Sequence, residues 1–293
     1  MSAETPARGE TPVTGEAPAS PDQTHRSGVE TVAARSIVVE GRGGSGTPVL
    51  FANGCGLPRQ VWGPVVDRLA RPVVTFDRPG IGTPWPRRLP TLAEEVETLA
   101  ELAAGLDQPV LVAHSMAALH AEGLLLEQPG LVSGLVLVDP SVEWRALRPW
   151  PGVLQQGPGL VSGLNRARGF GQLVSRAVVL GTRTQTVTGL SDDLRASMGL
   201  TYASDQAQAM ALAESIAYRD QVNALVDLRR RTALATVPTT VLCATNSHST
   251  QAMTRLCQHF RAHHVLIGNS RHLIMVDAPQ AVLAAIASPG GTR

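Results

Sequence analysis

The sequence contains no lysine, so all 25 of its basic residues are arginines. This absence excludes catalysis through a lysine Schiff base. The formal net charge is only +1, which does not favour nucleic acid or a membrane surface as a partner. The three cysteines are an odd number without metal-ligand spacing, so we expect neither a disulfide framework nor a zinc site.

Long apolar runs are missing too. No segment is long enough to span a bilayer, and the N-terminus has no hydrophobic signal core, so we expect a cytoplasmic protein. Residues 1–32 are rich in Pro, Glu, Thr, Ser, Ala and Gly and hold few bulky apolar residues. Such a segment cannot bury enough surface to offset its chain entropy, which predicts a disordered N-terminal arm.

From residue 33 onward, short apolar runs alternate with segments that favour helix. The expected strands are 36–40, 48–52, 72–76, 110–114, 134–138, 238–243 and 264–267. All-apolar strands separated by helices indicate an α/β fold with a mostly parallel sheet flanked by helices. Ligands of such sheets bind beyond the carboxyl ends of the strands, where Asn53, Asp77, Ser115 and Asp139 fall.

The strand pattern disappears between residues 141 and 236 and then resumes. This stretch favours helix at 159–180, 192–200 and 204–231. We interpret it as a helical cap inserted into a core made of residues 33–140 and 237–293. A separate helical domain is the alternative. Trp144 and Trp150, at the start of the insertion, are expected to line an apolar substrate pocket.

Ser115 ends an apolar run and begins a helix-forming segment. A sharp turn from strand to helix exposes a serine hydroxyl above a sheet, provided that the residues two before and two after are small. Here these residues are Ala113 and Ala117. The alternative is a serine that caps an ordinary helix.

A nucleophilic serine needs a base, and the base needs a group that orients it. Of the eight histidines, His272 follows the last expected strand and precedes the final helix. A loop in that place can bring the imidazole onto the serine. His114 adjoins Ser115 but is expected to point elsewhere on the turn.

Together these features resemble the α/β-hydrolase family over about residues 36–288. Residues 51–55 (FANGC) are similar to its oxyanion loop, with Asn53 in place of histidine, and residues 77–82 (DRPGIG) match its Asp-x-x-Gly-x-Gly turn. Residues 113–117 stand where the nucleophile belongs, and His272 lies seven residues before Pro279, as the catalytic histidine does.

The resemblance implies roles for single residues. Ser115 would be the nucleophile and His272 the base. The backbone N–H groups of Cys55 and Met116 would form the oxyanion hole. Asn53 and Gly54 would lie beside the substrate. No cofactor or metal is implied.

The orienting acid departs from the commonest pattern. Residues 244–249, where most members of the family place an aspartate, contain no carboxylate. Some members place the acid one strand earlier, which is the position of Asp139, so Asp139 is our predicted acid. The alternatives are Asn246, Asp277 or no acid at all.

The sequence therefore predicts a serine hydrolase with a Ser-His-Asp triad. It would cleave an ester, thioester, lactone or related carbonyl bond of a small or medium apolar molecule through an acyl-enzyme. The alternative is a non-hydrolytic or catalytically silent member of the fold, such as a ligand-binding protein, a lyase or a biosynthetic accessory. The oligomeric state is not encoded in any pattern that we can interpret.

Overall fold

One mixed sheet forms the centre of the molecule. The computed structural model describes residues 25–164, 170–245 and 250–291, and within them eight strands follow the order β1-β2-β4-β3-β5-β6-β7-β8. The outer strands β1 and β2 pair antiparallel, as do β2 and β4, whereas the remaining neighbours pair parallel. The strands are β1 (Arg26–Val32), β2 (Arg35–Arg42), β3 (Val49–Ala52), β4 (Val73–Asp77), β5 (Val110–His114), β6 (Gly134–Val138), β7 (Thr239–Ala244) and β8 (His263–Ile267).

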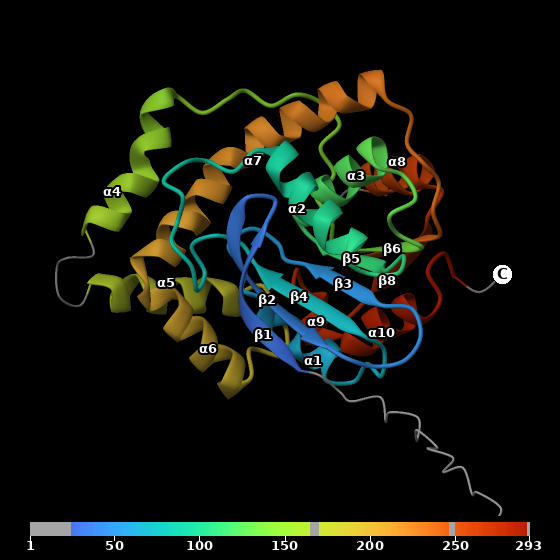
Figure 1. The fold of residues 1–293 in the computed structure, drawn as a ribbon, viewed down its shortest axis with the longest axis horizontal. Helices are drawn as coiled ribbons and strands as arrows, with labels where there is room; N and C mark the ends of the chain where they lie inside the picture. Colours follow the sequence, from blue (N-terminus) through green and yellow to red (C-terminus); the bar gives the residue numbers. More distant parts are fainter. Residues whose placement is uncertain (1–24, 165–169, 246–249, 292–293) are drawn as a thin grey trace, which may run out of the picture.

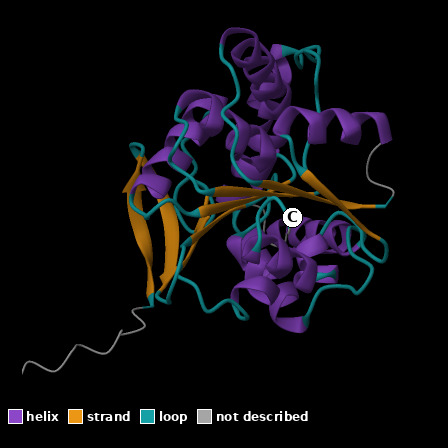
Figure 2. Ribbon diagram, turned by 90° about the vertical axis from the view of Figure 1, so that its right-hand side faces the viewer, coloured by secondary structure: helices purple, strands orange, loops and turns teal. Residues whose placement is uncertain are grey.

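Helices cover both faces of this sheet (Figure 2). Helices α2, α3 and α8 share one apolar core with the sheet, and α1, α9 and α10 share the other. These helices are α1 (Gly63–Val66), α2 (Leu92–Ala104), α3 (Ala117–Glu127), α8 (Thr250–Phe260), α9 (Ile274–Asp277) and α10 (Pro279–Ala287). The expected α/β fold is therefore confirmed.

Strand β5 shows why the sequence takes this form. All five of its residues are buried. Successive side chains of a strand point to opposite faces, and accordingly Leu111 and Ala113 join one core while Val110 and Val112 join the other. An unbroken apolar run is what a strand buried on both faces requires.

The first strand corrects the predicted N-terminal arm. We expected disorder up to residue 32, but Arg26–Val32 form β1 and pair with all of the facing residues of β2. The two strands are joined by Ala33 and Ala34, whose φ angles are 49° and 57°, as a tight two-residue hairpin requires. Polar composition misled the prediction because this edge strand is held by backbone hydrogen bonds rather than by buried side chains. Residues 1–24 lie outside the described part.

Four helices stand between β6 and β7 in the described residues of this stretch, and we call residues 141–236 the insertion. They are α4 (Gly157–Leu164), α5 (Phe170–Arg183), α6 (Asp192–Ala203) and α7 (Asp205–Arg231). In Figure 1, α7 crosses above α2 and α3. Four of its buried side chains join the same core as these two helices, namely Val222, Leu225, Val226 and Leu228. The insertion thus packs directly on the sheet's own helices.

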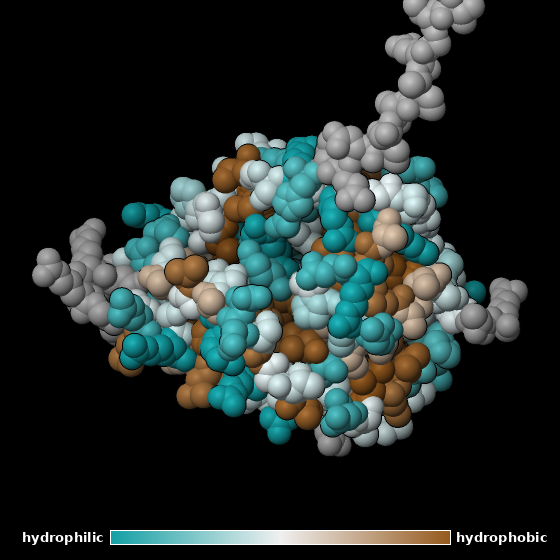
Figure 3. All heavy atoms as spheres, turned by 90° about the horizontal axis from the view of Figure 1, so that it is seen from below, coloured by the Kyte–Doolittle hydropathy of each residue, from teal (hydrophilic) through white to brown (hydrophobic). Residues whose placement is uncertain are grey.

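The surface is mixed in character. On the face seen in Figure 3, apolar side chains form small groups between polar ones. Several large apolar side chains of the insertion are exposed, including Leu160, Leu173, Leu180 and Leu200. No helix in the described ranges has both the length and the apolar character needed to cross a membrane.

Candidate active site

Ser115 occupies the sharp turn between β5 and α3. Its φ angle is 53°, a left-handed conformation that is unfavourable for a side chain larger than glycine and often occurs at functional sites. The turn is fixed by two backbone hydrogen bonds, from Ser115 N–H to the carbonyl of Val138 at 3.1 Å and from Ser141 N–H to the carbonyl of Ser115 at 3.1 Å. The backbone therefore holds the serine at the end of the sheet.

Three side chains that are far apart in the sequence form one hydrogen-bonded chain. Nε2 of His272 lies 3.0 Å from Oγ of Ser115, and its Nδ1 lies 2.6 Å from Oδ2 of Asp139. Because a carboxylate can only accept, Nδ1 carries the proton and Nε2 is free to accept from the serine hydroxyl. The predicted nucleophile, base and acid are thus brought together in the geometry that a triad needs.

Asp139 is held in place from its other side. Its side chain is buried, and its second oxygen accepts the backbone N–H of Ala244 at 3.1 Å. Its φ angle of 44° is also left-handed, a conformation that aspartate tolerates better than most residues. The carboxylate is therefore fixed before it meets His272.

Asn246 and Asp277 were the two alternatives for the acid. Asn246 lies outside the described residues. The Asp277 carboxylate accepts the backbone N–H groups of Val187, Thr188 and Arg271, each at 2.9 Å. Asp277 therefore connects the insertion to the loop that carries His272, and its described bonds do not involve the imidazole.

Residues 53–57, which we call the oxyanion loop, lie directly against Ser115. A Cβ atom on Gly54 would stand 2.5 Å from Nδ1 of His114 and 3.1 Å from Cβ of Ser115, so only glycine fits. The Asn53 side chain accepts from the indole N–H of Trp62 at 2.8 Å and donates to the Phe76 carbonyl at 2.9 Å. The Asn53 side chain therefore anchors the loop to Trp62 and to the backbone of Phe76, and its described bonds do not involve Ser115.

Comparison with known proteins identifies the family to which the chain belongs. A sequence model of the alpha/beta hydrolase family matches residues 49–285. The chain belongs to the alpha/beta hydrolase family. The matched range includes Ser115, Asp139 and His272.

The chain resembles curated relatives over a shorter stretch. It is 33% identical over 107 residues to a pimeloyl-[acyl-carrier protein] methyl ester esterase of Yersinia pseudotuberculosis (serotype O:1b, strain IP 31758), covering 36% of this chain and 41% of the relative. It is 28% identical over 119 residues to the protein of the same description from Legionella pneumophila (strain Paris), covering 39% and 46%. The chain thus spans less than half the length of these relatives.

Solved structures share the fold of this chain. The Cif epoxide hydrolase of Acinetobacter nosocomialis has a TM-score of 0.68 at 16% identity, covering 89% of this chain and 88% of its own. A thermophilic esterase of Thermogutta terrifontis has a TM-score of 0.64 at 20% identity, covering 89% and 97%. At such identities the likeness shows the fold and not the reaction.

Of the two residues predicted to supply the oxyanion hole, Met116 follows Ser115 directly in the sequence, and Cys55 follows Gly54, which packs against Ser115. Met116 follows the serine and is buried. The thiol of Cys55 lies 3.4 Å from Oγ of Ser215 on α7, and burial raises the pKa of this thiol to about 12. Cys55 therefore stays protonated near neutral pH, which leaves its backbone N–H as the group for the predicted role.

The side chains of the two tryptophans contact arginines. The ring of Trp144 lies 4.6 Å from the Arg229 guanidinium and 4.5 Å from that of Arg255. Trp150 is 38% exposed, with the Arg219 guanidinium 3.9 Å above its ring. Their described contacts do not include Ser115, so their part in substrate binding stays a prediction.

His114 has a structural role that the sequence pattern did not predict. This side chain is fully buried, and its Nε2 lies 3.0 Å from the backbone carbonyl of His272. Burial, reinforced by the neighbouring His272, lowers the pKa of His114 to about 3, so the neutral ring donates Nε2–H to this carbonyl. His114 thereby holds the loop of His272. The sequence feature that could have indicated this role is the position of His114 at the end of a fully buried strand.

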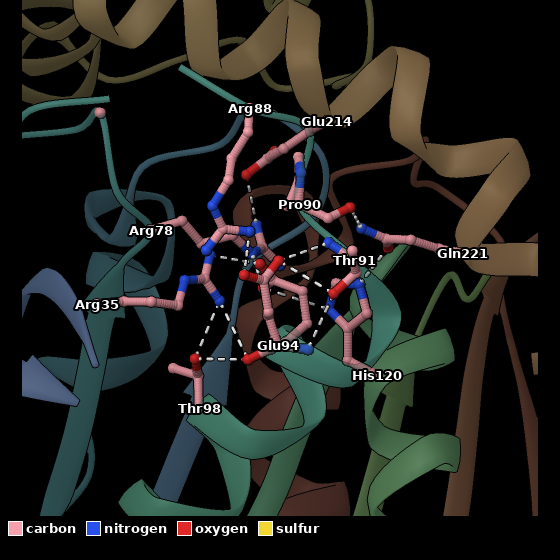
Figure 4. Close-up of polar contacts among 12 residues, drawn as sticks. Arg35, Arg78, Arg88, Pro90, Thr91, Glu94, Thr98, His120, Glu214 and Gln221 are labelled. Carbon is pink, nitrogen blue, oxygen red and sulfur yellow. Dashed lines mark hydrogen bonds and ion pairs between the residues drawn. The ribbon is translucent and has the colours of Figure 1, made fainter. Parts of the chain in front are cut away.

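A buried ionic network contacts the oxyanion loop through Arg78, and several of its side chains are shown in Figure 4. Its members are Arg35, Arg78, Glu95, His120 and Glu214. Both arginines bind Glu95, with Nη2 of Arg35 at 2.6 Å and Nε of Arg78 at 2.8 Å. Burial by itself would raise the pKa of Glu95, but the two guanidinium groups outweigh it and hold that pKa at about 2. The described residues contain no cluster of side chains suited to hold a metal.

Acidification is expected to destabilise the fold through its buried histidines. Burial lowers the pKa of His114 to about 3 and of His120 to about 4, against 6.5 for an exposed histidine. Between these pKa values the unfolded chain binds more protons than the folded chain. The free energy of unfolding therefore decreases as the pH falls from 6.5 towards 4, by about 1.4 kcal/mol per pH unit for each histidine. Urea unfolding between about pH 7 and about pH 5 measures this slope. In His120→Gln the slope should be smaller, and an unchanged slope would contradict the assignment.

Proposed function

We propose that this chain is a serine hydrolase that cleaves an ester or a related carbonyl bond through an acyl-enzyme. The observation that carries the proposal is the hydrogen-bonded chain from Ser115 through His272 to Asp139, at 3.0 and 2.6 Å. Serine is a weak nucleophile unless an adjacent base removes its proton, and the base must be held in the correct tautomer. Asp139 provides that orientation for His272.

The reaction begins when Oγ of Ser115 attacks the substrate carbonyl. His272 takes the hydroxyl proton on Nε2, and Asp139 stabilises the imidazolium that forms. The negative charge that develops on the carbonyl oxygen is held by the N–H groups of Cys55 and Met116. His272 then protonates the leaving group, and a water molecule activated by the same histidine releases the acyl group from Ser115.

The insertion is proposed to act as the cap that selects the substrate. Helix α7 packs against the oxyanion loop, since a Cβ atom on Gly56 would stand 3.1 Å from Cβ of Ala211. Ser215 of the same helix contacts Cys55. A substrate acyl group would therefore meet α7 as it enters. We propose a small or medium apolar molecule as the substrate, cleaved at an ester, thioester or lactone bond.

A methyl ester is one candidate within this class. The curated relatives are described as methyl ester esterases, and the matched stretch is too short to transfer their substrate. The serine at position 115 also argues against haloalkanes and epoxides, because the family members that open these compounds use an aspartate as nucleophile. Ester chemistry therefore has the stronger support.

Labelling with a fluorophosphonate tests this proposal. We expect rapid modification of the protein, mapped to Ser115 by mass spectrometry, because the probe reacts with serines that a base activates. His272→Ala should slow the labelling by at least about 10³-fold. Absence of labelling in folded protein would reject the hydrolase and favour a silent or non-hydrolytic member of the fold.

A further inference from the structure

The buried ionic network reaches the oxyanion loop through Arg78. This side chain is 3% exposed, and its Nη2 donates to the Asn53 carbonyl at 2.6 Å. Its Nη1 donates to the Gly54 carbonyl at 3.2 Å. The other arginine of the network, Arg35, bonds instead to groups of α2, namely Glu94, Glu95 and Thr98. Arg78 thus stands between the network and the loop.

The direction of one carbonyl fixes the direction of the next N–H. A trans peptide unit is planar, so its C=O and N–H point in opposite directions, and the described chain contains no cis peptide bond. Because the Gly54 carbonyl points at Arg78, the N–H of Cys55 points away from Arg78. The α-carbon of Gly54 meanwhile packs against Ser115. The guanidinium thereby constrains the direction of the backbone N–H that follows Gly54, the residue packed against Ser115.

Helix α7 holds the other side of Cys55. Oε2 of Glu214 accepts the backbone N–H of Gly56 at 2.5 Å, and its Oε1 lies 3.4 Å from Nη1 of Arg78. Glu214 is itself buried. Cys55 is therefore bracketed by two fixed neighbours, since Arg78 holds the carbonyl before it and Glu214 holds the N–H after it. One of these two groups comes from the core and the other from the insertion.

We propose that Arg78 is a positioning residue that orients the Cys55 N–H towards the developing oxyanion. Glu214, which belongs to α7 of the insertion, would make this orientation depend on the packing of the insertion against the loop. The inference rests on the proposed function, since it assigns the oxyanion hole of that reaction. Asn53 stands where the family has histidine, and its side chain bonds to Phe76 and Trp62. Arg78 donates to the carbonyls of both Asn53 and Gly54, and the Gly54 carbonyl also accepts the backbone N–H of Leu57 at 3.3 Å.

The test compares variants of the full chain on p-nitrophenyl butyrate. Arg78→Gln should lower kcat by about 10²-fold with KM changed less than about threefold, because an oxyanion donor acts in the transition state and not on the bound substrate. The inhibition constant of a trifluoromethyl ketone, whose adduct carries an oxyanion, should rise by a similar factor. Arg35→Gln, which alters the same network away from the loop, should stay within about threefold of wild type on both readouts.

A conservative variant covers the case in which Arg78→Gln does not fold. Arg78→Lys keeps the buried charge, but one ammonium cannot reproduce the planar fork that serves both carbonyls. We expect kcat of Arg78→Lys to fall by about tenfold and Arg78→Gln, where folded, to fall further. Wild-type kcat and inhibitor affinity in Arg78→Lys, or equal losses in Arg35→Gln, would overturn the proposal.

Amide hydrogen exchange gives a readout that needs no turnover. Exchange of the peptide covering residues 53–57 should accelerate in Arg78→Gln or Arg78→Lys and in Glu214→Gln, and stay at the wild-type rate in Arg35→Gln. A wild-type protein that does not cleave the ester would reject the proposed function, and exchange would then decide alone whether Arg78 orders the loop. Unchanged exchange in the Arg78 variants would reject the inference even if the enzyme is active.

Discussion

Replacement of Ser115 by alanine is expected to lower kcat on p-nitrophenyl butyrate by about 10⁶-fold, the size of loss that follows removal of a triad nucleophile. Without the hydroxyl no acyl-enzyme forms, and only substrate binding and the oxyanion hole contribute. Stopped-flow release of p-nitrophenol measures the effect, and the burst phase of the wild type should vanish. The fold should persist, because the described side-chain hydrogen bond of Ser115 is the one to His272.

Ser270→Ala is the matched control for this experiment. Ser270 lies in the loop that carries His272, but its hydroxyl bonds to the carboxylate of Asp277 at 3.3 Å. Its activity should stay within about tenfold of wild type, since only the support of the loop changes. Full activity in Ser115→Ala would show that another residue is the nucleophile.

Replacement of Asp139 by asparagine is expected to lower kcat by about 10⁴-fold. The amide keeps the shape of the side chain but can donate a hydrogen bond to Nδ1 of His272. The imidazole would then carry its proton on Nε2, where it cannot accept the proton of Ser115. Steady-state kinetics on the same ester measure the loss, and circular dichroism verifies the fold.

Asp277→Asn separates the two aspartates near His272. Asp277 binds backbone N–H groups of the insertion and of the loop, so its loss should reduce activity by no more than about tenfold. A small effect of Asp139→Asn together with a large effect of Asp277→Asn or Asn246→Ala would show that the orienting residue has been assigned wrongly.

The sequence predicted the sheet and the strand ends well, for a physical reason. Strands buried on both faces must be apolar throughout, so they are visible as runs, and functional side chains follow where these runs end. Ser115 and Asp139 follow β5 and β6 in this way. The structure places both beside His272, while their chemical roles stay predictions.

Features that depend on distant residues could not be predicted. Arg35 and Glu95 are 60 positions apart, and Arg78 and Glu214 are 136 positions apart, so no local pattern connects them. Strand β1 was missed because its partner, β2, supplies the hydrogen bonds that composition cannot reveal. The contacts of Trp144 likewise arise only when folding brings Arg229 of α7 and Arg255 of α8 onto its ring.

The connections between the insertion and the core bear on how such an enzyme can diversify. Residues 187 and 188 of the insertion donate to Asp277, and Glu214 binds the oxyanion loop. A chimera that exchanged residues 141–236 for those of another member would therefore remove supports of His272 and of the oxyanion loop at once. We therefore expect that the proposed cap cannot be exchanged between family members without loss of these contacts. Directed evolution towards new substrates would have to retain these contacts or rebuild them together with the new pocket.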